Sequence, residues 1–127
     1  MKSLASLLLT FVGMLSPALP AVAQNMDFNL TYHVERTPKS KLSIETCGSV
    51  VAKTARQTGL AADMENFPNQ LVVVRGGSEG RGAYVVQCIE VESTTVIVVQ
   101  GIDYRGQKAS MGQFADKAHA ALKAEAD

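Results

Sequence analysis

The chain has 127 residues, with 12 basic and 12 acidic side chains, so its formal net charge at neutral pH is zero. This balance provides no electrostatic attraction for nucleic acid or for an anionic membrane surface. Hydrophobic residues make up 46% of the chain and charged residues 19%, a composition that excludes an intrinsically disordered protein and predicts a buried core.

The first 23 residues have the pattern of a secretory signal that is removed on export. Lys2 precedes an apolar run over residues 4–15, and helix-breaking prolines come before the small residues at 21–23. The apolar run has 12 residues, whereas a helix needs about 20 to cross a bilayer, so a permanent anchor is the weaker interpretation. We therefore predict a periplasmic or secreted protein with one domain over residues 24–127.

Residues 27–35 alternate between apolar and polar side chains, which is typical of a half-buried strand. We expect the apolar side chains to face the core and the polar ones to face water. The apolar positions are Phe28, Leu30, Tyr32 and Val34. His33 belongs to the polar set, so we expect it to be a solvated imidazole.

A helix is predicted over residues 44–58, with Ser43 as its N-cap and Gly59 as its end. Cys47 lies on the apolar stripe of this helix, so its side chain is expected in the core. Residues 60–70 are expected to form a connection, because Phe67-Pro68-Asn69 is typical of a turn.

Residues 70–75, 83–92 and 95–103 are rich in valine and isoleucine, and short polar or glycine-rich turns separate them. This pattern predicts three antiparallel strands. A capping box, Ser110-x-x-Gln113, begins a closing helix with His119 at the edge of its apolar stripe. The order β-α-β-β-β-α predicts an α+β fold, with one four-stranded, mostly antiparallel sheet and both helices packed on one face.

Export changes the meaning of Cys47 and Cys88, the two cysteines of the chain, because an oxidising compartment lets such a pair persist as a disulfide. The pair lacks Cys-x-x-Cys spacing, and His33 and His119 lie far apart in the sequence. A redox or metal pair is therefore the weaker interpretation, and we predict a structural disulfide.

This disulfide would orient the strand that contains Cys88, because alternate side chains of a strand point to opposite faces. Its far face would then carry Ala83, Val85, Gln87, Ile89 and Val91. The next strand adds either Ile97 and Val99 or Val96 and Val98 to the same face. Monomeric soluble proteins rarely expose such a patch. We take Val85, Gln87, Ile89 and Val91 as candidate interface residues.

Residues 75–82 form a glycine-rich segment with two arginines. Unhindered backbone N–H groups and guanidinium groups suit a phosphate or carboxylate, which makes the segment a candidate anion-binding loop. The candidate residues are Arg75, Gly76, Gly77, Gly80 and Arg81. No Lys-Ser or Lys-Thr follows, and the next element is a strand rather than a helix, so a flexible hairpin loop is the favoured interpretation.

The same segment contains Gly76-x-Ser78-x-Gly80, the form of a hydrolase nucleophile elbow, with Asp103 or Asp116 and then His119 further along. The elbow requires a helix after the serine, whereas a strand is predicted here. We therefore predict no catalytic residues. No cofactor or metal is expected either, because the chain lacks His-Glu-x-x-His and a spaced carboxylate loop.

Four stretches of the chain carry a family resemblance. They are residues 28–34, Glu45-Thr46-Cys47-Gly48, Asp63-Met64-Glu65-Asn66-Phe67-Pro68 and Gly101-Ile102-Asp103-Tyr104-Arg105-Gly106-Gln107. The chain resembles, over nearly all of its mature length, small exported bacterial proteins catalogued only as a domain of unknown function. The resemblance implies a Gram-negative periplasmic setting, and it implies no activity or functional residue.

These observations favour an exported, non-catalytic module that binds a protein partner or a second copy of itself through the apolar far face. The alternative is a small ligand-binding or anion-binding protein, or an enzyme, that uses residues 75–82. Neither class is expected to bind nucleic acid or to keep a membrane span after the signal is removed.

Overall fold

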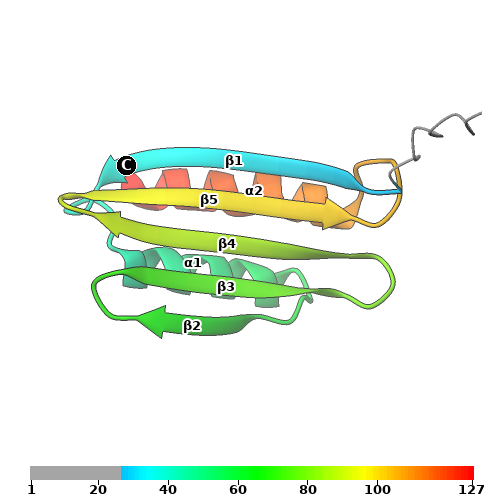
Figure 1. The fold of residues 1–127 in the computed structure, drawn as a ribbon, viewed down its shortest axis with the longest axis horizontal. Coiled ribbons are helices and arrows are strands. Elements are labelled where there is room, and N and C mark those ends of the chain that lie inside the picture. Colours follow the sequence, from blue (N-terminus) through cyan, green and yellow to red (C-terminus); the bar gives the residue numbers. More distant parts are fainter. Residues whose placement is uncertain (1–26) are drawn as a thin grey trace, which may run out of the picture.

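The computed structural model describes residues 27–127, so the predicted signal at residues 1–23 lies outside the described part. The elements are β1 (Asn29–Pro38), α1 (Ile44–Gln57), β2 (Asp63–Phe67), β3 (Leu71–Ser78), β4 (Gly82–Val91), β5 (Thr94–Asp103) and α2 (Ser110–Ala126). The strands form one antiparallel sheet in the order β1-β5-β4-β3-β2, and both helices lie behind it (Figure 1). The α+β fold with both helices on one face is therefore confirmed.

The sheet has five strands rather than the four expected, because residues 63–67 form β2 instead of a connection. Its acidic and amide side chains have low strand propensity, so the segment does not stand out in the sequence. A tight turn joins it to β3, with Asn69 at φ 62°, a conformation that asparagine tolerates. Arg75 of β3 also forms ion pairs with Asp63 and Glu65 of β2.

The core lies between the sheet and the helices and includes the predicted disulfide. Cys47 of α1 and Cys88 of β4 are bonded, with their Cα atoms 6.2 Å apart, and both are fully buried. Tyr84 faces the same side and packs on Phe114 of α2, with ring centroids 4.5 Å apart. The predicted facing of β4 is therefore confirmed.

Tyr84 also shows how the core satisfies a polar group. Its hydroxyl donates a hydrogen bond of 2.6 Å to the carbonyl of Ala61. Burial raises the pKa of Tyr84 to about 12, so the phenol stays protonated at neutral pH and keeps donating this bond.

The local signals predicted for the first helix are confirmed at both of its ends. The Ser43 hydroxyl accepts a hydrogen bond of 3.1 Å from the backbone N–H of Thr46, as an N-cap does. At the other end Gly59 has φ 81°, the left-handed conformation that ends many helices.

The predicted capping box of the second helix is not formed. Ser110 is the first residue of α2, and the N-cap position, Ala109, has no side chain that can accept a hydrogen bond. The buried carboxylate of Asp103 takes this role, accepting bonds of 2.8 Å from the N–H of Ala109 and 3.0 Å from those of Met111 and Gly112. A residue at the end of β5 thus caps the next helix.

Replacing Asp103 by alanine is expected to lower the free energy of unfolding by about 2 to 3 kcal/mol, because three helix N–H groups lose their acceptor in a buried place. Urea unfolding followed by circular dichroism measures the loss. Asp103→Asn keeps one acceptor oxygen and is the matched control, so it should lose less. Equal stability of the wild type and the alanine variant would contradict this role of the carboxylate.

The N-terminal part of α2 lies very close to the sheet. A Cβ at Gly101 of β5 would lie 2.2 Å from the carbonyl oxygen of Met111, and one at Gly112 would lie 2.6 Å from the Thr31 hydroxyl. Glycine at these two positions therefore lets α2 pack against both β5 and β1, which places the following turns of α2 over the inner face of β1.

The facing of the first strand is the reverse of the prediction. The polar side chains of β1 point toward α2, and the exposed fractions of Leu30, Tyr32 and Val34 are 43%, 64% and 55%. The reason is the position of β1 at the sheet edge, beyond the apolar stripe of α2, where the helix presents Asp116 and His119. His33 is accordingly not a solvated imidazole but a partner of α2.

Candidate functional site

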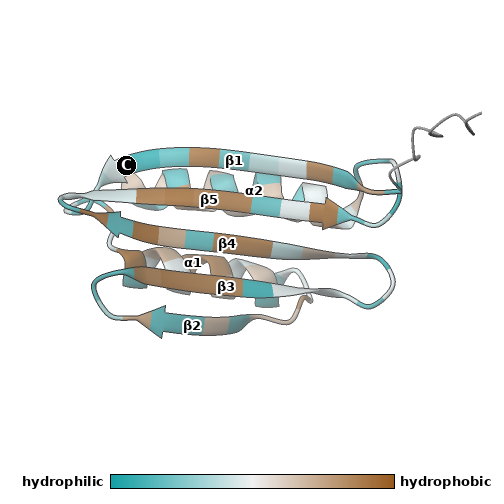
Figure 2. Ribbon diagram, viewed as in Figure 1, coloured by the Kyte–Doolittle hydropathy of each residue, from teal (hydrophilic) through white to brown (hydrophobic). Residues whose placement is uncertain are grey.

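The side of the sheet that faces away from both helices is here called the open face. It consists of Leu30, Tyr32, Val34 and Arg36 of β1; Val96, Val98, Gln100 and Ile102 of β5; Ala83, Val85, Gln87, Ile89 and Val91 of β4; Leu71, Val73 and Arg75 of β3; and Asp63, Glu65 and Phe67 of β2. None of the described elements covers this side (Figure 1). Apolar residues occupy much of β3, β4 and β5 (Figure 2).

The four candidate interface residues of β4 all lie on the open face, namely Val85, Gln87, Ile89 and Val91. Of the two alternatives for β5, the structure selects Val96 and Val98, whereas Ile97 and Val99 are buried under the helices. The apolar residues of β1, which the sequence analysis expects in the core, extend the same patch. The patch is therefore larger than expected.

Charged residues of the open face lie at its two edges. Arg36 stands on β1, and among residues 27–127 it forms no ion pair. At the opposite edge Arg75 pairs with Glu65 and with Asp63, the latter at 3.2 Å. The hydrogen bond to Glu65 raises the pKa of Arg75. Two carboxylates and one guanidinium give this edge a net charge of −1, and Arg36 gives the other edge +1.

The candidate anion-binding residues are divided between a strand and a turn. Arg75, Gly76 and Gly77 belong to β3, while Gly80 and Arg81 lie in the turn that leads to β4. The Arg75 guanidinium is held by the carboxylates of β2. Anion binding by this segment stays a prediction. Of the two arginines, Arg81 is the one in the turn, and among residues 27–127 it forms no ion pair.

A hollow of about 370 Å³ lies beside this turn, lined by Arg81, Arg105 and the start of α2. The buried Asp103 carboxylate also lines it and already binds three N–H groups of the helix start. In a phosphate site at a helix start, the N–H groups are free to bind the anion. Here they are already bound to the Asp103 carboxylate, which would repel an incoming anion.

The residues of the hydrolase-like pattern do not form a catalytic group. Ser78 ends β3, and the Asp103 carboxylate is bonded to the start of α2. His119 contacts Glu35, whose β5 partner is Ile97, six residues from Asp103. Six strand residues span about 20 Å, so Asp103 lies too far from His119 to act with it, and so does Ser78, which is in register with Asp103 through Gly82. Asp116, the other candidate, contacts His33, which stacks on His119, but Ser78 is absent from this group.

A histidine–carboxylate cluster joins the inner face of β1 to α2, and the sequence did not predict it. The rings of His33 and His119 stack with centroids 4.1 Å apart and planes 9° apart. Nε2 of His33 lies 2.8 Å from Oδ1 of Asp116, and Nε2 of His119 lies 2.7 Å from Oε1 of Glu35. Lys108 also pairs with Asp116.

This geometry does not suit a metal ion. An imidazole nitrogen directs its lone pair in the plane of the ring, so the parallel rings of His33 and His119 do not aim at a common point. Within residues 27–127, no group of three or more histidines, cysteines or carboxylates is arranged to hold a metal. The cluster instead fastens the edge strand to the closing helix.

The carboxylates of the cluster are held in their charged form. The hydrogen bond to His119 lowers the pKa of Glu35, and the hydrogen bond to Lys108, followed by that to His33, lowers the pKa of Asp116. A group whose folded pKa is depressed stabilises the fold above its unfolded pKa, and this contribution disappears as the pH falls through its folded pKa. The cluster should therefore weaken below about pH 4.

We expect the double variant Glu35→Gln, Asp116→Asn to lose about 1 kcal/mol of stability at pH 7, since both carboxylates are partly exposed and screened by water. Between pH 5 and pH 3 the wild type should lose more stability than this variant. Urea unfolding at both pH values measures the difference. Parallel losses in the two proteins would show that the cluster is not the source of the acid sensitivity.

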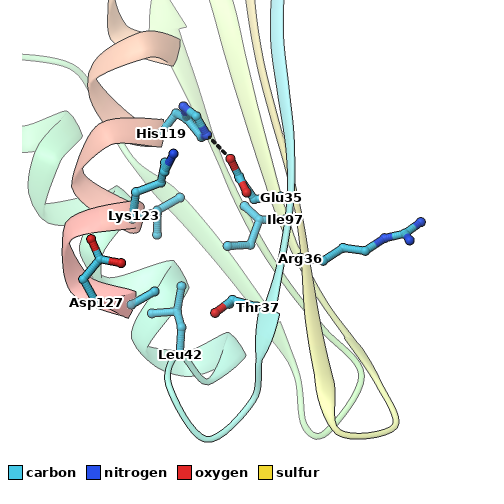
Figure 3. Close-up of a pocket in the computed structure, with 10 residues that line it drawn as sticks. Glu35, Arg36, Thr37, Leu42, Ile97, His119, Lys123 and Asp127 are labelled. Atoms are coloured by element: carbon cyan, nitrogen blue, oxygen red, sulfur yellow. Dashed lines mark hydrogen bonds and ion pairs between the residues drawn. The ribbon is translucent and has the colours of Figure 1, made fainter.

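A cleft of about 160 Å³ opens beside the cluster, where α2 diverges from β1. The His119–Glu35 pair forms one wall, and Leu42 and Ile97 lie on the inner side (Figure 3). Arg36 belongs to the same rim, but its side chain points away from the cleft (Figure 3). The volume is below the roughly 300 to 1,000 Å³ of ordinary small-molecule sites.

Comparison with known families gives a match over the whole described part of the chain. The profile of the "Family of unknown function (DUF6180)" matches residues 27–127. The chain belongs to this family. Membership brings no activity and no functional residue with it, as the resemblance in the sequence implied.

Other comparisons add little to the family assignment. No curated protein matches the chain. A solved structure described as "Crystal structure of Ara h 8.0201" aligns with a TM-score of 0.35 and 11% identity, over 78% of this chain and 95% of that chain. This likeness is too weak to carry an argument. In residues 27–127 no helix is both long enough and apolar enough to cross a membrane.

The sequence contains a weak indication of the histidine–carboxylate cluster. His33 and Glu35 are two residues apart on a strand, and Asp116 and His119 are three apart on a helix, so each pair shares one face. Two such pairs of titratable residues are a pattern from which a contact could have been suspected. Nothing in the sequence indicated that the two faces meet.

Proposed function

We propose that this chain is a non-catalytic interaction module that pairs with a second copy of itself through the open face. The observation that carries the proposal is the facing of β1. This edge strand turns its polar side chains to α2 and its apolar ones, Leu30, Tyr32 and Val34, to solvent. Apolar side chains that the core does not use are typical of an interface.

The size of the open face supports a stable pair. Five strands spaced about 4.8 Å apart, with about eight residues each at 3.3 Å, give a surface of roughly 24 by 27 Å. Covering it on two copies buries on the order of 1,300 Å², which lies within the range of specific protein interfaces.

The polar residues in the middle of the open face favour a second copy as the occupant. Gln87 lies on β4, the central strand, among valines, and pairs across the ladder with Val98 and Val73. A glutamine amide both donates and accepts hydrogen bonds, so two copies of Gln87 can satisfy each other. An entirely apolar partner would bury the amide without hydrogen bonds, at a cost.

Export to an oxidising compartment belongs to the same proposal. Its support is the disulfide between Cys47 and Cys88, together with the signal pattern of residues 1–23. In such a compartment the disulfide persists and holds α1 against β4, on the opposite side from the open face.

The alternative, anion binding by residues 75–82, has less support. Arg75 is neutralised by Asp63 and Glu65 on the open face, and the hollow beside Arg81 already contains the Asp103 carboxylate. The mutual pairing of His33, His119 and their carboxylates likewise favours a structural role over catalysis.

Sedimentation velocity of the mature protein, from about 1 to 500 μM, tests the proposal. We expect a reversible shift from monomer to dimer as the concentration rises. The experiment should be run with the disulfide intact. Moderate salt is used, because low salt exaggerates the attraction between the charged edges and high salt screens it almost completely. A protein that remains monomeric over the whole range would overturn the proposal.

A further inference from the structure

Building on the proposed function, we infer that the two copies pack sheet against sheet around a two-fold axis parallel to the strands. In this arrangement β1 of each copy covers β2 of the other. The inference rests on the order of the strands and on the charges at the two edges of the open face.

The strand order defines what each symmetry axis superposes. Because β4 is the middle strand of β1-β5-β4-β3-β2, an axis parallel to it places β4 on β4, β5 on β3 and β1 on β2. Two stacked sheets lie about 10 Å apart with strands aligned to within about 30°. A row here means residues of neighbouring strands that are paired in register. An axis parallel to the strands therefore places each row of one copy over the same row of the other.

The charges of the two edges then complement each other. Arg36 belongs to the row of Val96, Ile89, Leu71 and Phe67, and Glu65 lies in the next row of β2. Placing β1 on β2 sets the Arg36 guanidinium over the Phe67 ring and beside the Glu65 carboxylate, where both attract a cation. The +1 edge of each copy therefore meets the −1 edge of the other, twice in the dimer.

The other face-to-face two-fold axis runs across the strands and places each strand on its own copy. Centred on the row of Gln87, it sets Glu65 opposite Glu65 and brings the two Arg36 residues to the same edge. Like charges opposite one another are destabilising, and no described residue of the open face compensates Arg36 in that arrangement. The charges thus select the axis parallel to the strands.

Spin labels at the two ends of the sheet distinguish the axes. Ser93 is exposed in the β4–β5 turn, and Glu79 is exposed in the turn between β3 and β4 at the opposite end. With the axis parallel to the strands, two labels at Ser93→Cys lie at the same end, within about 25 Å. With the axis across the strands they lie at least a strand length apart, about 35 Å, because a ten-residue strand spans about 33 Å.

Pulsed electron double resonance on the Ser93→Cys protein, and separately on Glu79→Cys, measures these distances. We expect a short distance from both variants. A dimer whose Ser93–Ser93 distance is long would overturn the inferred axis and leave the proposed pairing intact. If neither variant gives a measurable intermolecular distance and sedimentation at the same concentrations detects no dimer, both the inferred axis and the proposed pairing are overturned.

A charge reversal gives an independent result. Arg36→Glu is expected to weaken dimerisation at least about fivefold at low salt, because it places a carboxylate against Glu65 of the other copy at both edges of the interface. Lys117→Glu, an exposed residue of α2 with the same change in charge, is the matched control and should leave the affinity unchanged. An unchanged or tighter dimer for Arg36→Glu would contradict the parallel axis.

Discussion

Replacing Cys47 and Cys88 together by alanine is expected to lower the free energy of unfolding by about 4 kcal/mol. The bonded residues are 41 positions apart, and a cross-link over a loop of this length removes that much chain entropy from the unfolded state. Both side chains are fully buried, and alanine adds no unsatisfied polar group, so the loss reports mainly the cross-link.

Urea unfolding of the oxidised wild type and of the double alanine variant measures this loss. The wild type unfolded in the presence of a thiol reductant is the matched control, and it should approach the stability of the variant. A difference below about 1 kcal/mol between the oxidised wild type and the variant would contradict a stabilising role for the disulfide.

The second large effect is expected for Val98→Asp, which should weaken dimerisation at least about 100-fold. Val98 lies near the centre of the open face, between Val34 and Gln87 in the cross-strand row. In the dimer both copies would bury a carboxylate without a partner, which costs several kcal/mol. In the monomer the residue at position 98 is only partly buried and the carboxylate can reach water, so the fold should lose less stability than the dimer does.

Sedimentation of Val98→Asp beside the wild type measures the affinity, and urea unfolding confirms that the variant is folded. Ala120→Asp introduces the same side chain at an exposed position of α2 and serves as the matched control. Equal dimer affinity for Val98→Asp and the wild type would show that the open face is not the interface.

Features set by local chemistry were predictable from the sequence. Ser43 caps α1 because its hydroxyl reaches an N–H three residues away, and Gly59 ends the helix because it adopts a positive φ. The facing of β4 followed from one long-range assumption, the disulfide between Cys47 and Cys88, which the structure contains.

Features set by the surroundings of a segment were not predictable in the same way. Alternation in β1 defines two faces, but only the neighbouring helix decides which of them is inside. Here α2 presents Asp116 and His119 to the strand, so the polar face, with His33, is the inner one. β2 was missed for a similar reason, because its pairing with β3 outweighs its low intrinsic propensity.

The candidate site was predicted in part. The β4 side of the open face followed from strand parity, whereas the contribution of Leu30, Tyr32 and Val34 required the true facing of β1. The charged edges were also hidden, because Arg75 meets Asp63 and Glu65 only after β2 joins the sheet. Contacts between elements that are far apart in the sequence can be identified only when the order of the strands in the sheet is known.

Intermolecular nuclear Overhauser effects in a mixture of isotope-labelled and unlabelled protein test the central claim most directly. We predict that methyl groups of the open face, such as those of Val85 and Val98, contact protons of the other copy at high concentration. Intermolecular contacts that arise only from α1 and α2, or none in a sample concentrated to millimolar levels, would contradict pairing through this face.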